Sequence, residues 1–97
     1  MEKVALLARV QAKPGQEATV ENFLTQALAM AQQEEGTLRW YAFKINENTF
    51  GIFDTFGSES GRQAHLSGEI AKALLANAEA LLSVPPVIEQ LDLIAVK

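Results

Sequence analysis

The stretch Thr49–Leu66, TFGIFDTFGSESGRQAHL, contains most of the information about the fold of this chain. Its first eight residues are rich in aromatic and β-branched side chains, which indicates a strand, and a Gly-Ser turn follows them. A serine of this turn is suited to cap a short helix that runs to the end of the stretch. The segment therefore carries an acidic residue, Asp54, on a strand and the only histidine, His65, on the next helix.

The hydrophobic pattern outside this stretch predicts three further strands and two further helices. Apolar residues in the longest helix recur at the spacing of one buried stripe, and Gly36 stands where a left-handed residue often ends a helix. Glu34 and Glu35 lie at the C-terminal end of that helix, where the helix dipole does not favour acidic side chains. The predicted elements are strands over 3–11, 38–45, 49–56 and 87–96, and helices over 16–34, from residue 59 or 61 to 66, and over 69–82.

This order of elements predicts an α+β fold in a single domain that spans residues 1–97. Two strand–helix–strand units joined by a hairpin form a ferredoxin-like βαββαβ arrangement with one antiparallel sheet. The helices of such a domain cover one face of the sheet and leave the other face bare.

The predicted strands are apolar on both faces. Trp40 and Tyr41 point to opposite faces, as do Ile52 and Phe53, so the bare face of a monomer would expose several large side chains. Burying about 600 Å² of apolar surface in a dimer contributes on the order of 15 kcal/mol to the free energy of association, before the entropic and desolvation costs of association are subtracted. We therefore expect a homodimer in which two sheets pack face to face.

Composition excludes several classes of function. The net charge of −4 disfavours binding to nucleic acid or to an anionic membrane, because phosphate neutralisation needs clustered Lys and Arg. The chain has no cysteine and one histidine, so one chain cannot form a disulfide, a thiolate metal site or a multi-histidine metal site. No apolar run approaches the roughly 20 residues that span a membrane, and no signal peptide is evident. We therefore expect a cytoplasmic protein.

Three segments in sequence resemble the antibiotic biosynthesis monooxygenase family, which includes quinol monooxygenase-like dimeric α+β barrel proteins. They are KPGQE at 13–17, EEGTLRWY at 34–41 and IFDTFGSESGRQAHL at 52–66. The chain departs from the family pattern at Asp54, where glutamate is usual, at Phe56, where tryptophan is frequent, and at Ile70, where a second histidine is frequent. The absence of a histidine after His65 disfavours the haem-degrading branch.

The resemblance implies a monooxygenase that acts on a small aromatic, quinol-type molecule and molecular oxygen in an apolar cavity, without a cofactor. His65 would remove a proton from the substrate, since its ordinary pKa near 6.5 suits this role. Asp54 could orient His65 or accept a substrate hydroxyl, and Arg9 could stabilise an anionic intermediate. The structural alternatives are a histidine bound to a backbone carbonyl, an ion pair of Asp54 with Arg9 or Arg62, and a surface or dimer ion pair of Arg9.

Aromatic residues are the candidate substrate-binding groups. A planar ring could stack on their side chains, although packing in the core or in a dimer is the alternative use. Trp40 and Tyr41 face opposite ways, so at most one of them lines a given pocket. The candidates are Trp40, Tyr41, Phe53 and Phe56.

Two other functions are compatible with the same fold. One is a non-catalytic, dimeric module that binds a small ligand or is associated with stress. The other is an isomerase or decyclising enzyme, which would exchange protons with its substrate and consume no oxygen.

Overall fold

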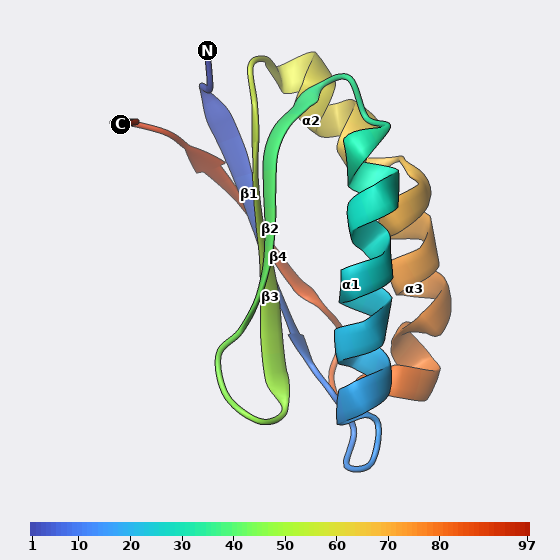
Figure 1. The fold of residues 1–97 in the computed structure, drawn as a ribbon. Coiled ribbons are helices and arrows are strands. Elements are labelled where there is room, and N and C mark those ends of the chain that lie inside the picture. The colour runs from blue at the N-terminus through green and yellow to red at the C-terminus, as the bar shows by residue number, and fades with distance from the viewer.

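A computed structural model describes all 97 residues and shows the predicted α+β, ferredoxin-like fold. The four strands form one antiparallel sheet in the order β2-β3-β1-β4. All three helices lie on one side of this sheet (Figure 1). The elements are β1 (Val4–Gln11), α1 (Glu17–Gln32), β2 (Thr37–Lys44), β3 (Thr49–Phe56), α2 (Glu59–Leu66), α3 (Glu69–Leu81) and β4 (Val87–Asp92).

The register of the strands places Asp54 on the side of the sheet that faces the helices. Asp54 pairs with Leu6 of β1 and with Trp40 of β2, so these three side chains form one row across the sheet. Leu6 and Asp54 are both buried, at 3% and 1% exposure. A carboxyl group thus lies in the middle of an otherwise apolar layer.

The main hydrophobic core lies between this face of the sheet and the helices. Four residues of the predicted α1 stripe are buried, namely Val20, Leu24, Ala27 and Ala31, whereas Phe23 is partly buried and Leu28 is 45% exposed. Helix α3 contributes Ile70 and Leu74. The largest cluster of buried residues comprises Ala8, Val10, Ala12, Val20, Leu24, Phe50, Ile52, Leu74 and Leu82.

Helix α2 is fixed over one end of the sheet by its cap and by a buried arginine. The Ser58 hydroxyl accepts a hydrogen bond from the Gly61 amide, which confirms the predicted capping by a serine of the turn. The Arg62 guanidinium is 6% exposed, pairs with Glu59 and donates to backbone carbonyls of β1 and β4. The suggested ion pair between Arg62 and Asp54 is therefore wrong.

Two local expectations are wrong for identifiable reasons. Gly36 does not adopt a left-handed conformation, which only Gly15 does, with φ of 87°. A Cβ atom on Gly36 would lie 2.9 Å from the Cα of Gly61, so a close backbone approach requires glycine there. The last strand ends at Asp92 rather than at residue 96, because its neighbour β1 begins at Val4 and only one further backbone hydrogen bond, from the Leu93 amide to the Lys3 carbonyl, follows.

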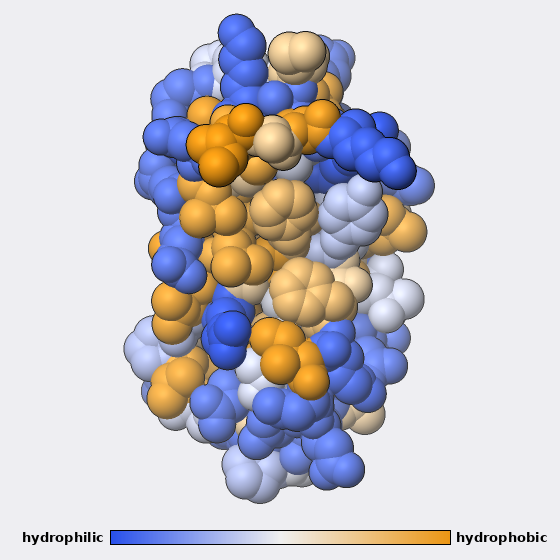
Figure 2. Space-filling view, turned by 90° about the vertical axis from the view of Figure 1, so that its left-hand side faces the viewer, coloured by the Kyte–Doolittle hydropathy of each residue, from blue (hydrophilic) through white to orange (hydrophobic).

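The face of the sheet that carries no helix is apolar. In Figure 2, an apolar patch occupies the centre of this face and polar side chains surround it. A row of three side chains, Tyr41, Phe53 and Leu7, crosses β2, β3 and β1. The large apolar side chains on this face, called the open face below, are Leu7, Tyr41, Phe43, Phe53, Val87 and Leu91.

None of the three helices combines the length and the apolar character that crossing a membrane requires.

Candidate functional site

A cavity of about 190 Å³ lies between the sheet and helices α2 and α3. Asp54 and His65 are its only polar lining residues. An apolar cavity with a few convergent polar groups is the usual form of a small-molecule site. The apolar lining residues are Leu6, Ala8, Ile52, Leu66, Ile70, Ala71, Leu74, Leu75 and Ile88.

The structure brings together the two residues that the sequence singled out in its most informative stretch. Nε2 of His65 lies 2.9 Å from Oδ2 of Asp54, which is the distance of an ion pair. The contact is not aligned as a hydrogen bond, and neither Asp54 oxygen has a hydrogen-bond partner within the chain. Both oxygens are almost completely covered by the protein, so Asp54 belongs to the cavity wall with its capacity to accept hydrogen bonds unused.

A second carboxylate, which the sequence did not assign to the site, contacts the other side of the His65 ring. Nδ1 of His65 lies 2.6 Å from Oε1 of Glu34, in the turn after α1. The Thr37 hydroxyl donates to the same oxygen at 2.7 Å. The one signal in the sequence was the unfavourable acidic pair at the end of α1, and the contact with His65 explains Glu34.

The two carboxylates determine the protonation of His65. Burial by itself lowers the pKa of His65, but the close contact with Asp54, the hydrogen bond with Glu34 and the charges of both carboxylates outweigh this effect and raise the pKa to about 9. The ring is therefore an imidazolium at neutral pH, with its Nδ1–H hydrogen-bonded to Glu34 and its Nε2–H close to Asp54. We expected His65 to act as the base, but in this state neither ring nitrogen has a free lone pair, whereas Asp54 has free acceptor oxygens.

Two of the four candidate aromatic residues lie on the side of the sheet that contains the site. Phe56 is fully buried, and its ring centroid lies 5.4 Å from that of His65 at an interplanar angle of 47°. Trp40 packs against the core from the same row as Asp54, and its buried Nε1 has no hydrogen-bond partner. Both residues support the site through packing, and neither lines the 190 Å³ cavity.

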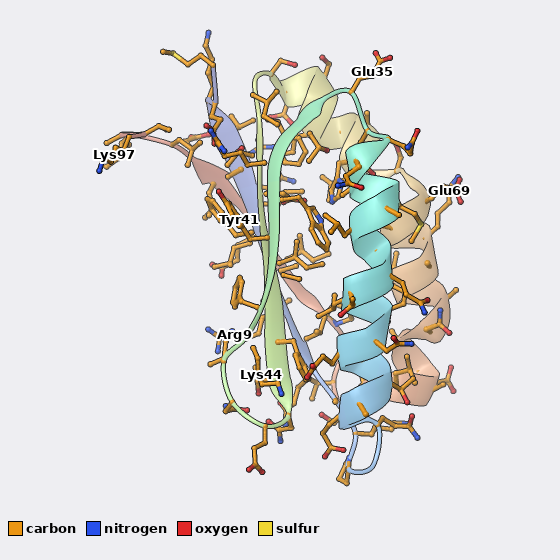
Figure 3. All side chains as sticks on the ribbon, viewed as in Figure 1. Arg9, Glu35, Tyr41, Lys44, Glu69 and Lys97 are labelled. Atoms are coloured by element: carbon orange, nitrogen blue, oxygen red, sulfur yellow. The ribbon has the colours of Figure 1, made fainter.

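Three of the predicted site residues lie on the opposite side of the sheet. Arg9, Tyr41 and Phe53 belong to the open face, and Figure 3 shows Arg9 and Tyr41 projecting away from the helices. The structure therefore does not bring Arg9 to His65 or Asp54 within one chain. Trp40 and Tyr41 face opposite ways, as predicted, but both line a cavity of about 490 Å³ beside α1 and β2, so the expectation that at most one of them lines a given pocket is wrong.

The site offers hydrogen-bonding and acid–base chemistry rather than a metal cage. Nowhere in the chain do three His, Cys, Asp or Glu side chains converge in a way that could hold a metal ion. Each of the two carboxylates contacts a different nitrogen atom of the His65 ring. Their negative charges therefore stabilise the positive charge of His65.

Comparison with known proteins identifies a near relative and further structures with the same fold. No family model and no curated protein matches the chain. A proposed antibiotic biosynthesis monooxygenase from Caulobacter crescentus CB15 is 21% identical, with a TM-score of 0.82 over 97% of this chain and 92% of that one. Another antibiotic biosynthesis monooxygenase is 15% identical, with a TM-score of 0.81 over 95% and 99% of the two chains. At these identities the likeness shows the fold alone.

The NE2512 protein of Nitrosomonas europaea, a protein of unknown function, is much more similar. Its crystal structure has a TM-score of 0.97 with this chain, and the two sequences are 56% identical. The match covers 100% of this chain and 94% of the other. The chain therefore belongs to the same family as the NE2512 protein of Nitrosomonas europaea.

Proposed function

We propose that the protein is a cofactor-independent monooxygenase that acts on a small, hydroxylated aromatic molecule of the quinol type. The single observation that carries this proposal is a buried Asp54 carboxylate with free acceptor oxygens, at the wall of an apolar cavity and beside the His65 imidazolium. Two of the structures with the same fold are described as monooxygenases, one of them as a proposed one, which agrees with this chemistry.

The size of the cavity restricts the substrate. A buried apolar cavity of about 150 Å³ holds benzene, and the present cavity measures about 190 Å³. The difference leaves room for one or two small substituents on a single ring. A hydroquinone with its hydroxyl group directed at Asp54 would satisfy both the apolar lining and the unused acceptor.

The proposed reaction uses Asp54 as acid and base in turn. Asp54 accepts the proton of the substrate hydroxyl, while the cation of His65 offsets the negative charge in the cavity. The electron-rich substrate anion reacts directly with dioxygen, and Asp54 returns the proton to the oxygen atom that leaves as water. A hydroquinone and one O₂ then give a hydroxyquinone and one H₂O, so the ring loses the electrons and no external reductant is consumed.

Oxygen uptake with single-ring hydroquinones tests the proposal. We expect uptake by the wild type and by Asp92→Asn, which changes an exposed carboxylate on β4, and at least a 100-fold lower rate for Asp54→Asn. Ala71→Leu should abolish both uptake and ligand-induced stabilisation, because it fills the cavity. Stabilisation of the wild type by the ligand without any oxygen uptake would instead establish a non-catalytic binding protein.

We also propose that the protein is a homodimer formed by its open face. Tyr41 and Val87 on this face are each about half exposed in one chain, at 51% and 53%. Packing of the open face against the same face of a second copy would remove the central apolar patch from water. The two sheets would then form a face-to-face sandwich. The central position of Arg9 on this face makes it a candidate for a contact between the two copies.

A further inference from the structure

A polar groove of about 530 Å³ lies on the outer side of His65, next to the turn between α1 and β2. His65 is the only residue that lines both this groove and the apolar cavity. Its ring therefore separates the two spaces, with Nε2 directed at Asp54 and Nδ1 at Glu34. The lining of the groove consists of Met30, Gln33, Glu34, Glu35, Gly36, Thr37, Gly61, Ala64, His65, Gly68 and Glu69.

Glu34 is held in place by hydrogen bonds within the α1–β2 turn and by the space beside Gly68. Its backbone carbonyl accepts from the Thr37 amide at 3.3 Å, and its carboxylate accepts from the Thr37 hydroxyl at 2.7 Å. A Cβ atom on Gly68 would lie 3.2 Å from Oε2 of Glu34, so the absence of a side chain there leaves space for the carboxylate. Only 20% of the Glu34 side chain is exposed.

The charge balance of the site depends on this third residue. A carboxylate at Nδ1 stabilises the imidazolium form of His65, which then presents an N–H rather than a lone pair to Asp54. The remaining acidic residues of the groove, Glu35 and Glu69, make no hydrogen bond to the ring and project into solvent (Figure 3).

We propose that Glu34 is a positioning residue of the active site, which holds Nδ1–H of His65 so that Nε2–H faces Asp54 and Asp54 remains the free base of the cavity. This inference rests on the proposed function, in which Asp54 takes the substrate proton. Glu34 does not line the cavity, so it acts through His65.

The first arm of the test does not require turnover. The imidazole nitrogen and carbon signals of His65 are titrated by NMR in the free wild type and in Glu34→Gln, with Glu35→Gln as the control that removes the same charge from the neighbouring residue. We expect the midpoint of the His65 titration to fall by about one pH unit or more in Glu34→Gln. The midpoint should stay at the wild-type value in Glu35→Gln. An unchanged midpoint in Glu34→Gln would overturn the proposal.

The second arm measures oxygen uptake against pH. In Glu34→Gln, kcat should fall about 10-fold, while KM should stay within about twofold of the wild-type value. The alkaline limb of the pH profile of oxygen uptake should move to lower pH, together with the midpoint of the His65 titration. A shifted midpoint with wild-type kcat and pH profile would show that Glu34 is structural only. If the wild type takes up no oxygen, the proposed function fails, and the NMR arm still decides whether Glu34 controls His65.

Discussion

Nε2 of His65 lies 2.9 Å from Oδ2 of Asp54, and this contact joins helix α2 to the middle of strand β3 at the wall of an apolar cavity. Asp54 is 1% exposed and His65 is 8% exposed. Neither charge can be screened by solvent to any great extent, so the two groups depend on each other for stability as well as for chemistry.

Removal of His65 should destabilise the protein because it leaves the Asp54 carboxylate buried without its partner. We expect His65→Gln to lower the free energy of unfolding by about 3 to 5 kcal/mol, measured by urea denaturation. The double variant Asp54→Asn/His65→Gln should recover most of this loss, since it removes both charges. Equal stability of the single and double variants would contradict the predicted coupling.

The stability of the wild type should fall as the pH rises from about 6.5 to 9. The pKa of His65 is raised from 6.5 to about 9 in the folded protein, so the stabilisation by its cation is complete below pH 6.5 and is lost as the pH rises through the folded value. The expected loss is on the order of 3 kcal/mol, from urea denaturation at several pH values. The chain has no other histidine and no cysteine, so the free energy of unfolding of His65→Gln should change little over this pH range.

Substitution of Gly61 should move helix α2. In Gly61→Ala, the new Cβ atom would lie 3.0 Å from the Gly36 carbonyl oxygen, and backbone atoms of the turn would have to shift. We expect a change in the His65 NMR signals and a decrease of about 1 to 3 kcal/mol in the free energy of unfolding. The higher helix propensity of alanine should partly offset this decrease.

Gly15→Ala provides the matched control for Gly61→Ala. Gly15 has a φ of 87° and open space around it, so alanine there should cost about 1 to 2 kcal/mol through backbone strain alone. The His65 signals should not change. A Gly61→Ala protein with wild-type His65 signals would show that α2 does not depend on this contact.

A charge in the middle of the open face should separate the proposed dimer. Sedimentation velocity should give the wild type about twice the chain mass of 10.6 kDa, and Phe53→Glu should sediment as a single chain. Phe53 occupies the centre of the row with Tyr41 and Leu7. Val84→Asp, at an exposed apolar position between α3 and β4, should remain dimeric. A monomeric wild type would refute the proposed dimer.

The fold could be predicted because each element carries its own local signal. The apolar stripe of α1 and the aromatic residues of the hairpin have the correct periods, and a breaker separates each pair of elements. The last strand was predicted four residues too long, because its end depends on where β1 begins and not on local propensity.

The site could be predicted only where its members lie close together in the sequence. Asp54 and His65 belong to one strand–turn–helix segment, so their proximity could be expected. Glu34 was missed because it reaches His65 from 31 positions away, across a tertiary contact. Arg9 was misplaced because β1 is apolar on both faces, and side-chain alternation alone does not reveal which face meets the helices.

The contact between Gly36 and Gly61 has a consequence for how this family could acquire new ligands. Because the α1–β2 turn and α2 meet backbone to backbone, α2 cannot shift toward this turn to make room for a larger molecule. The opposite wall of the cavity, formed by Ala71, Leu74 and Leu75 of α3, consists of side chains that can change in size. Relatives that bind different molecules should therefore keep the position of α2 and His65 and vary the size of the α3 side chains that line the cavity. Ligand choice and proton chemistry could then evolve separately.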